Sequence, residues 1–213
     1  IMKQLWDGPT DEAGNRLWYG FRPGVLFWNK VIPIGAFYYT LSGKPRPFFL
    51  STYYLRWVTK NPKQTFESLT VPQYRSLHRQ SVTELARFSA DSADLHPFAA
   101  HGGKLMIDHG IDDPLIPVDG TLDYCRRMLS EVGAAKAEQF FRLYITPGDG
   151  HGSCRWHAPG ITEKDGMQAL IAWVETGSAP QALRTVQVNR HGDTLRTDQV
   201  RPYTIQNHEE DEA

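Results

Sequence analysis

The 213-residue sequence lacks several features, and each absence excludes a class of protein. No apolar run approaches the roughly 20 residues that a membrane-spanning helix needs. The formal net charge is −1, so no basic surface for nucleic acid or anionic lipid is indicated. The opening residues, IMKQLWDGP, contain neither the apolar core nor the small-residue cleavage site of a signal peptide. We therefore expect a protein that binds neither nucleic acid nor membrane.

Cysteine is also scarce, because Cys125 and Cys154 are the only two in the chain. They permit at most one internal disulfide, so cysteine usage leaves the cellular compartment open. The chain begins with Ile1 rather than Met, which fits a processed or truncated polypeptide. With 40% hydrophobic and 22% charged residues, the composition is that of a globular protein with a substantial core.

Three regions differ in their pattern. Residues 1–94 hold most of the aromatic side chains, broken by Gly and Pro into short pieces, with one helix predicted over about 72–89. Residues 95–184 alternate strands (KLMID, FRLYIT) with helices, an order typical of an α/β protein with a parallel sheet covered by helices. Two strands are too few for an independent sheet, so we expect it to continue in sequence outside this chain. Residues 185–213 predict a hairpin around NRHGD and then an acidic tail.

The two predicted strands end in polar loops, IDHGIDDPLIP and PGDGHGSC. Because carboxyl ends of neighbouring parallel strands share one edge of the sheet, Asp113 and His151 are expected to meet there. An Asp at that place can fix the imidazole tautomer and stabilise the imidazolium formed when His accepts a proton. Simpler interpretations stay open: Asp113 can form the turn before Pro114, Asp112 can take its place, and His151 can bond its own loop.

The order acid before His matches α/β-hydrolases, in which a serine nucleophile precedes both. That serine is missing, because the chain has no G-x-S-x-G and no serine on a strand-turn-helix elbow. The segment AHGGKL at His101 has a superficial likeness to the oxyanion loop of esterases. It lies immediately before the acid-bearing strand, so we interpret it as a plain turn.

Four segments together resemble the C-terminal half of the tannase and feruloyl esterase family: LWDGPTDEAGNRLWYGFRPG, HGGKLMIDHGIDDPLIPVDGTLDYCRRM, FFRLYITPGDGHGSC and DGMQALIAWVETGSAPQAL. The resemblance covers residues 1–184. It implies the C-terminal part of an α/β-hydrolase sheet (95–184) plus most of an inserted, aromatic-rich lid domain (1–94). It also implies hydrolysis of esters of aromatic acids such as gallate and ferulate, one branch of the family cleaving a mono-ester of terephthalate.

The same resemblance assigns roles to individual residues. The family's acid falls on Asp113 and its catalytic histidine on His151, while His109 and Ile116 fall at pocket-lining positions. Trp28 and Phe27 are our candidates for stacking on an aromatic acyl group, although most aromatics of residues 1–94 are expected to build a core. The family usually has a bridged Cys directly after its histidine. Here that position is Gly152, which leaves Cys154 as the disulfide candidate.

The resemblance also sets expectations for partners and location. The family's nucleophile and calcium loop lie upstream of the matching residues, so we expect a Ser-bearing N-terminal chain or segment as partner. We expect no metal or organic cofactor in this chain. The resemblance implies an extracellular or periplasmic enzyme, and the few cysteines leave that expectation open. The alternative is a non-catalytic binding or regulatory chain derived from the same fold.

Overall fold

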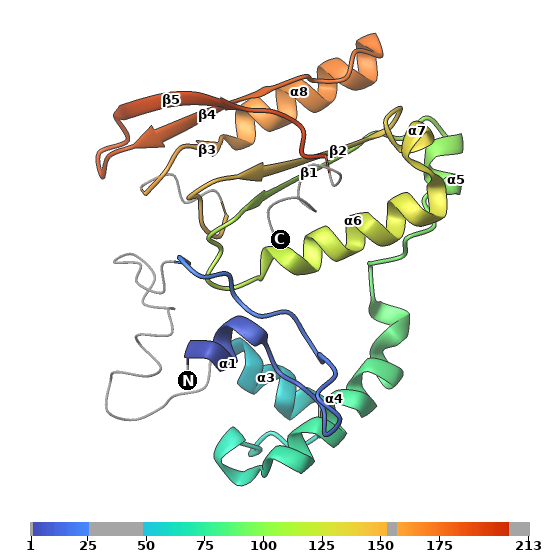
Figure 1. Cartoon of the computed structure of the whole chain (residues 1–213), viewed down its shortest axis with the longest axis vertical. Coiled ribbons are helices and arrows are strands. Elements are labelled where there is room, and N and C mark those ends of the chain that lie inside the picture. Colours follow the sequence, from blue (N-terminus) through green and yellow to red (C-terminus); the bar gives the residue numbers. More distant parts are fainter. Residues whose placement is uncertain (1, 26–48, 153–156, 205–213) are drawn as a thin grey trace. The chain divides into compact units, whose positions relative to one another are not determined.

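The structure is a computed structural model that describes residues 2–25, 49–152 and 157–204 (Figure 1). Its contacts divide the chain into two compact units. One comprises Ile1–Thr10, Arg16–Leu26 and Ser92–Ala213, and the other comprises Asp11–Asn15 and Phe27–Asp91. The N-terminal segments 1–10 and 16–26, which the sequence grouped with the lid, thus share contacts with the α/β unit. Within that unit, Arg22 forms an ion pair with Asp119 at 2.7 Å.

The centre of the α/β unit is a pair of parallel strands. Strand β1 (Leu105–Gly110) pairs with β2 (Phe141–Thr146) in continuous register, from Leu105 opposite Phe141 to Gly110 opposite Thr146. Between them the chain forms α6 (Val118–Val132) and the short α7 (Ala134–Ala137), while α5 (His96–Ala100) precedes β1. The predicted β-α-β order and the α/β fold class are confirmed.

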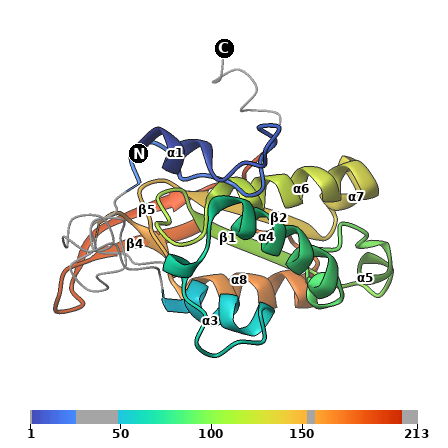
Figure 2. The same cartoon turned by 90° about the horizontal axis from the view of Figure 1, so that it is seen from below.

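Opposite faces of this strand pair are covered by different elements. Helix α6 buries a stripe at helical spacing against alternate residues of β2; the stripe is Val118, Leu122, Cys125, Met128 and Val132. The other face carries Tyr144, which is fully buried beside Ile161 and Leu183. Figures 1 and 2 show α6 on one side of the strands and α8 (Glu163–Thr176) on the other. Successive side chains of β2 point to opposite faces, so one set packs against α6 and the other packs on the side of α8.

Helix α8 has a capping residue at each end, Thr162 and Gly177. The Thr162 hydroxyl accepts a hydrogen bond from the backbone N–H of Asp165 at 2.9 Å, and Gly177 ends the helix with a left-handed φ of 76°. The inward residue Trp173 is 1% exposed. The Lys104 ammonium and the Arg142 guanidinium lie over its ring, at 5.5 and 5.1 Å from the centroid.

An antiparallel sheet follows in the order β3-β4-β5, made of β3 (Gly160–Ile161), β4 (Leu183–Val188) and β5 (Thr194–Val200). Strands β4 and β5 form the hairpin expected around NRHGD, where Asn189 N–H bonds the Asp193 carbonyl at 2.9 Å. Beyond β5, the N–H of Tyr203 donates to the Leu143 carbonyl at 2.7 Å. This segment therefore covers part of the edge of β2.

The described helices of the second unit lie between residues 49 and 88. This unit contains α3 (Phe49–Val58), a 3₁₀ turn (Phe66–Ser68), α4 (Val71–Leu85) and a second 3₁₀ turn (Ala86–Phe88). The helix predicted over about 72–89 thus ends its α-helical part at Leu85. Thr70 and Gln73 form a reciprocal capping box at its start. The first helix of the chain, α1 (Met2–Asp7), belongs to the α/β unit. No helix in the described ranges is long and apolar enough to cross a bilayer.

The burial of Trp173 leads to a stability prediction. Trp173→Ala leaves a large cavity beneath α8, so the free energy of unfolding should fall by about 3–5 kcal/mol in urea denaturation. Val174→Ala is the matched control, because Val174 is the next residue of the helix and is 60% exposed. It should change stability by less than about 0.5 kcal/mol. Equal effects of the two substitutions would contradict this packing.

Candidate active site

The loops after β1 and β2 are held together by backbone hydrogen bonds. Ile111 N–H donates to the Thr146 carbonyl at 3.0 Å, and Asp112 N–H donates to the Asp149 carbonyl at 3.1 Å. Gly110 permits this close approach, because a Cβ there would lie 2.3 Å from the Asp149 carbonyl oxygen. The acid-bearing loop and the His-bearing loop are therefore fixed against each other at the carboxyl edge of the strands.

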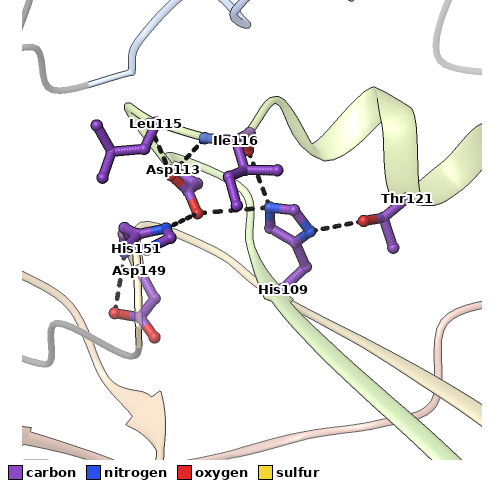
Figure 3. A network of polar contacts seen from close by, with 8 residues as sticks. His109, Asp113, Leu115, Ile116, Thr121, Asp149 and His151 are labelled. Atoms are coloured by element: carbon purple, nitrogen blue, oxygen red, sulfur yellow. Dashed lines mark hydrogen bonds and ion pairs between the residues drawn. The ribbon is translucent and has the colours of Figure 1, made fainter. Parts of the chain in front are cut away.

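Asp113 and His151 meet at this edge (Figure 3). Oδ2 of Asp113 lies 2.9 Å from Nδ1 of His151. Oδ1 of the same carboxylate accepts the backbone N–H groups of Leu115 and Ile116 at 2.7 and 2.9 Å. Asp113 therefore has both of the roles that the sequence left open. Oδ1 forms the turn, and Oδ2 contacts His151.

The polar contacts determine the protonation of this pair. Burial alone would raise the pKa of Asp113, but contacts from His109, the two backbone N–H groups and His151 together hold that pKa below its ordinary value. An ionised carboxylate only accepts hydrogen bonds, so Nδ1 of His151 carries the proton. In neutral His151 the lone pair is then on Nε2. No group in the described ranges bonds to Nε2, and the side chain is 42% exposed.

Asp112, the alternative acid, has a different environment. Burial raises the pKa of its carboxyl. Its carboxylate makes no hydrogen bond to His109 or His151 in the described part of the chain, and its backbone N–H serves to join the two loops. The geometry therefore pairs His151 with Asp113.

His109 lies on the far side of the Asp113 carboxylate, with its side chain 11% exposed. Its Nδ1 is 2.8 Å from the Thr121 hydroxyl, and its Nε2 is 3.0 Å from the Ile116 carbonyl and 3.6 Å from Oδ2 of Asp113. Burial lowers the pKa of His109, but Asp113 and the Ile116 carbonyl outweigh it, and the net pKa is raised. Ile116, the other expected pocket residue, contributes backbone groups to this network and leaves its side chain exposed.

Three residues of this arrangement were not identified from the sequence. Thr121 lies in the first turns of α6, twelve residues after His109, and no local pattern indicates their contact. Asp149 is buried, and its Oδ1 accepts the Gly150 N–H at 3.0 Å. Gly110 has no role in the interpretation of the sequence alone. Asp149 is flanked by glycines two residues before His151, and this pattern is a signal in the sequence, because Asp readily bonds nearby backbone.

Three further candidates, Trp28, Phe27 and Cys154, lie outside the described residues. Cys125 is a free thiol on the buried face of α6, where burial raises its pKa to about 12. Within the described residues, no group of three His, Cys, Asp or Glu side chains is arranged to hold a metal ion.

Comparison with known proteins connects this geometry to a family. The model of the family "Tannase and feruloyl esterase" matches residues 51–209, so the chain belongs to that family. A probable feruloyl esterase of Arthroderma benhamiae is 26% identical over 205 residues, which cover 91% of this chain and 36% of the relative. A mono(2-hydroxyethyl) terephthalate hydrolase of Piscinibacter sakaiensis is 38% identical over 96 residues, covering 44% of this chain and 15% of that protein.

A solved structure of an esterase from Aspergillus oryzae has the same fold over most of this chain. The match has a TM-score of 0.73 at 21% identity and covers 95% of this chain and 41% of that one. The family match over residues 51–209 confirms the family resemblance seen in the sequence. The chain spans little more than a third of the length of the first curated relatives it matches.

Gly110 provides a test of how the two loops are held together. In Gly110→Ala the new Cβ meets the Asp149 carbonyl, so the loops must separate, with an expected loss of about 1–3 kcal/mol of stability. Gly166→Ala in α8 is the control, because its Cβ would meet only Ile161 at an ordinary 3.6 Å. Urea denaturation should show no loss for the control. A Gly110→Ala protein as stable as the wild type would contradict the close contact.

Proposed function

We propose that this chain is the C-terminal part of a serine carboxylic ester hydrolase acting on esters of aromatic acids such as gallate or ferulate. The observation that carries the proposal is the 2.9 Å contact between Asp113 and Nδ1 of His151, which leaves Nε2 of a partly exposed imidazole available as a base. Family membership supports ester hydrolysis, and the relatives' names motivate the aromatic acyl group.

In the proposed mechanism, His151 moves the proton and Asp113 stabilises its charged form. Nε2 takes the proton of a serine hydroxyl as that oxygen attacks the ester carbonyl, and Asp113 stabilises the imidazolium. When the tetrahedral intermediate collapses, the C–O bond to the alcohol breaks and Nε2–H protonates the departing oxygen. A water then gives a proton to the same nitrogen as its oxygen attacks the acyl-serine carbonyl. The bond to the serine oxygen breaks, Nε2–H returns the proton to that oxygen, and the acid is released. The proposed steps need neither a metal nor an organic cofactor.

The nucleophile in this proposal comes from outside these 213 residues. Two observations support this part of the proposal. The sequence contains no G-x-S-x-G elbow, and the chain covers about a third of the length of its relatives. Backbone N–H groups near that serine would hold the oxyanion. By the same family resemblance, we propose an extracellular or periplasmic location.

The two neighbouring aspartates give the sharpest test of the acid assignment. In the full-length protein that contains this chain, Asp113→Asn should lower kcat on methyl ferulate or methyl gallate by roughly 10⁴-fold, because Asn favours the wrong imidazole tautomer. His151→Ala should have a comparable effect. Asp112→Asn, on the same loop, should cost much less. An inactive Asp112→Asn protein together with an active Asp113→Asn protein would falsify the assignment.

The external nucleophile leads to a separate prediction. A polypeptide of residues 1–213 alone should not hydrolyse methyl gallate or methyl ferulate, because His151 has no serine to activate. The full-length protein should hydrolyse them and lose activity on treatment with a serine-reactive phosphonate. Peptide mass mapping after labelling should place the phosphonate outside residues 1–213. Labelling within residues 1–213 would refute an external nucleophile, and a full-length protein inert towards both esters and phosphonate would favour the non-catalytic alternative.

A further inference from the structure

We propose that His109 is a positioning residue that holds the Asp113 carboxylate in the orientation that His151 requires. The inference rests on the proposed function of the same site and deepens it. Its basis is the juxtaposition in Figure 3, where both imidazoles face the same carboxylate oxygen, His151 at 2.9 Å and His109 at 3.6 Å.

The partners of His109 fix its tautomer. The Ile116 carbonyl at 3.0 Å and the ionised Asp113 can only accept, so Nε2 of His109 carries a proton in both charge states. In the neutral ring, Nδ1 then accepts from the Thr121 hydroxyl at 2.8 Å. His109 is therefore the Nε2–H tautomer, whereas His151 is the Nδ1–H tautomer. The two rings direct their N–H groups at Asp113 from different sides.

The contact of His109 with Asp113 orients the carboxylate in two ways. At 3.6 Å the direct contact is electrostatic rather than a well-formed hydrogen bond. The indirect route passes through Ile116, whose carbonyl accepts from His109 while its N–H donates to Oδ1 of Asp113. His109 thus fixes the position of Ile116, whose N–H binds Oδ1 of Asp113. It also attracts Oδ2, the oxygen that faces His151. Thr121 anchors the ring to α6, an element separate from both loops.

This role differs from the pocket lining expected from the sequence. Both ring nitrogens of His109 are engaged by protein groups, and only 11% of the side chain is exposed. Little of the ring is left to contact a substrate. Loss of His109 should therefore lower kcat, which depends on the Asp113–His151 geometry, and should change KM little.

The charge of His109 gives a second signature. The titratable groups that act on it are Asp113, on the loop, and Asp108, on its own strand, with His151 across the shared oxygen. Their combined effect with the Ile116 carbonyl raises the pKa of His109, so this ring takes up a proton readily as the pH falls. The positive charge then lies beside the oxygen that His151 also faces, 2.9 Å from Nδ1. Without His109 this charge is absent, so the acid limb of kcat/KM should change position.

The experiment compares matched variants of the full-length protein in the hydrolysis of methyl ferulate. His109→Ala should lower kcat by roughly 10²-fold through a misplaced carboxylate, and His109→Gln should recover much of it, because its amide N–H replaces Nε2–H. Thr121→Val, which lacks only the hydroxyl, should lower kcat about tenfold, and Thr121→Ser should retain most of it. His101→Ala is the control, because the one partner of that exposed ring among the described residues is the Pro97 carbonyl; it should match the wild type.

Three results would contradict the positioning role of His109. A raised KM with unchanged kcat would make His109 a substrate contact and overturn the positioning role. A reduced kcat with the acid limb in its wild-type place in both His109 variants would reduce His109 to a general structural residue. His109→Gln as damaged as His109→Ala would equally overturn the proposal.

An independent readout keeps the inference separate from the proposed function. Ring ¹⁵N NMR of the wild-type protein should give Nε2–H for His109 and Nδ1–H for His151, with the His151 Nδ1–H signal shifted or broadened in His109→Ala. This holds even if the protein hydrolyses neither ester, in which case only the proposed function fails. The opposite tautomer for His109, or an unchanged His151 signal in His109→Ala, would overturn the positioning role whatever the activity.

Discussion

The arrangement at the sheet edge depends on one buried negative charge. A carboxylate as enclosed as that of Asp113, 5% exposed, is stable only when its oxygens are hydrogen-bonded or paired with charge. Oδ1 receives two backbone N–H groups, which shape the loop after β1, and Oδ2 faces two imidazoles. The hydrogen bonds and ion pairs of the Asp113 carboxylate therefore determine the conformation of the loop after β1. They also determine the tautomer of His151 and the placement of His109.

That charge can be satisfied only because two strands end side by side. The parallel register places Gly110 opposite Thr146, and the absence of a side chain at Gly110 lets the Asp149 carbonyl approach. Helix α6 covers one face of the strands and supplies Thr121 from its first turns, so the same element that closes the core also anchors the site. The packing of α6 on the strands and the hydrogen bond from Thr121 to His109 therefore depend on each other.

Much of this could be predicted from the sequence, for identifiable reasons. The strands around β1 and β2, helix α6 and the caps of α8 follow from local periodicity and from Thr162 and Gly177, which act through neighbouring residues. Asp113 and His151 could be brought together because parallel strands share an edge. The contact of His109 with Thr121, and the choice of Asp113 over Asp112, depend on side-chain directions in three dimensions. Spacing along the chain does not determine these directions.

The acid–base part of the proposed machinery is self-contained. Its polar contacts join residues between His109 and His151, and all of them lie in one compact unit. These contacts join side chains to backbone groups, or join side chains less than about forty residues apart in the sequence. The Asp113–His151 pair can therefore form without the segment that carries the proposed nucleophile. In the proposed enzyme, the serine then meets a carboxylate and an imidazole whose orientation is already fixed. This is the condition under which proton transfer needs little reorganisation in the transition state.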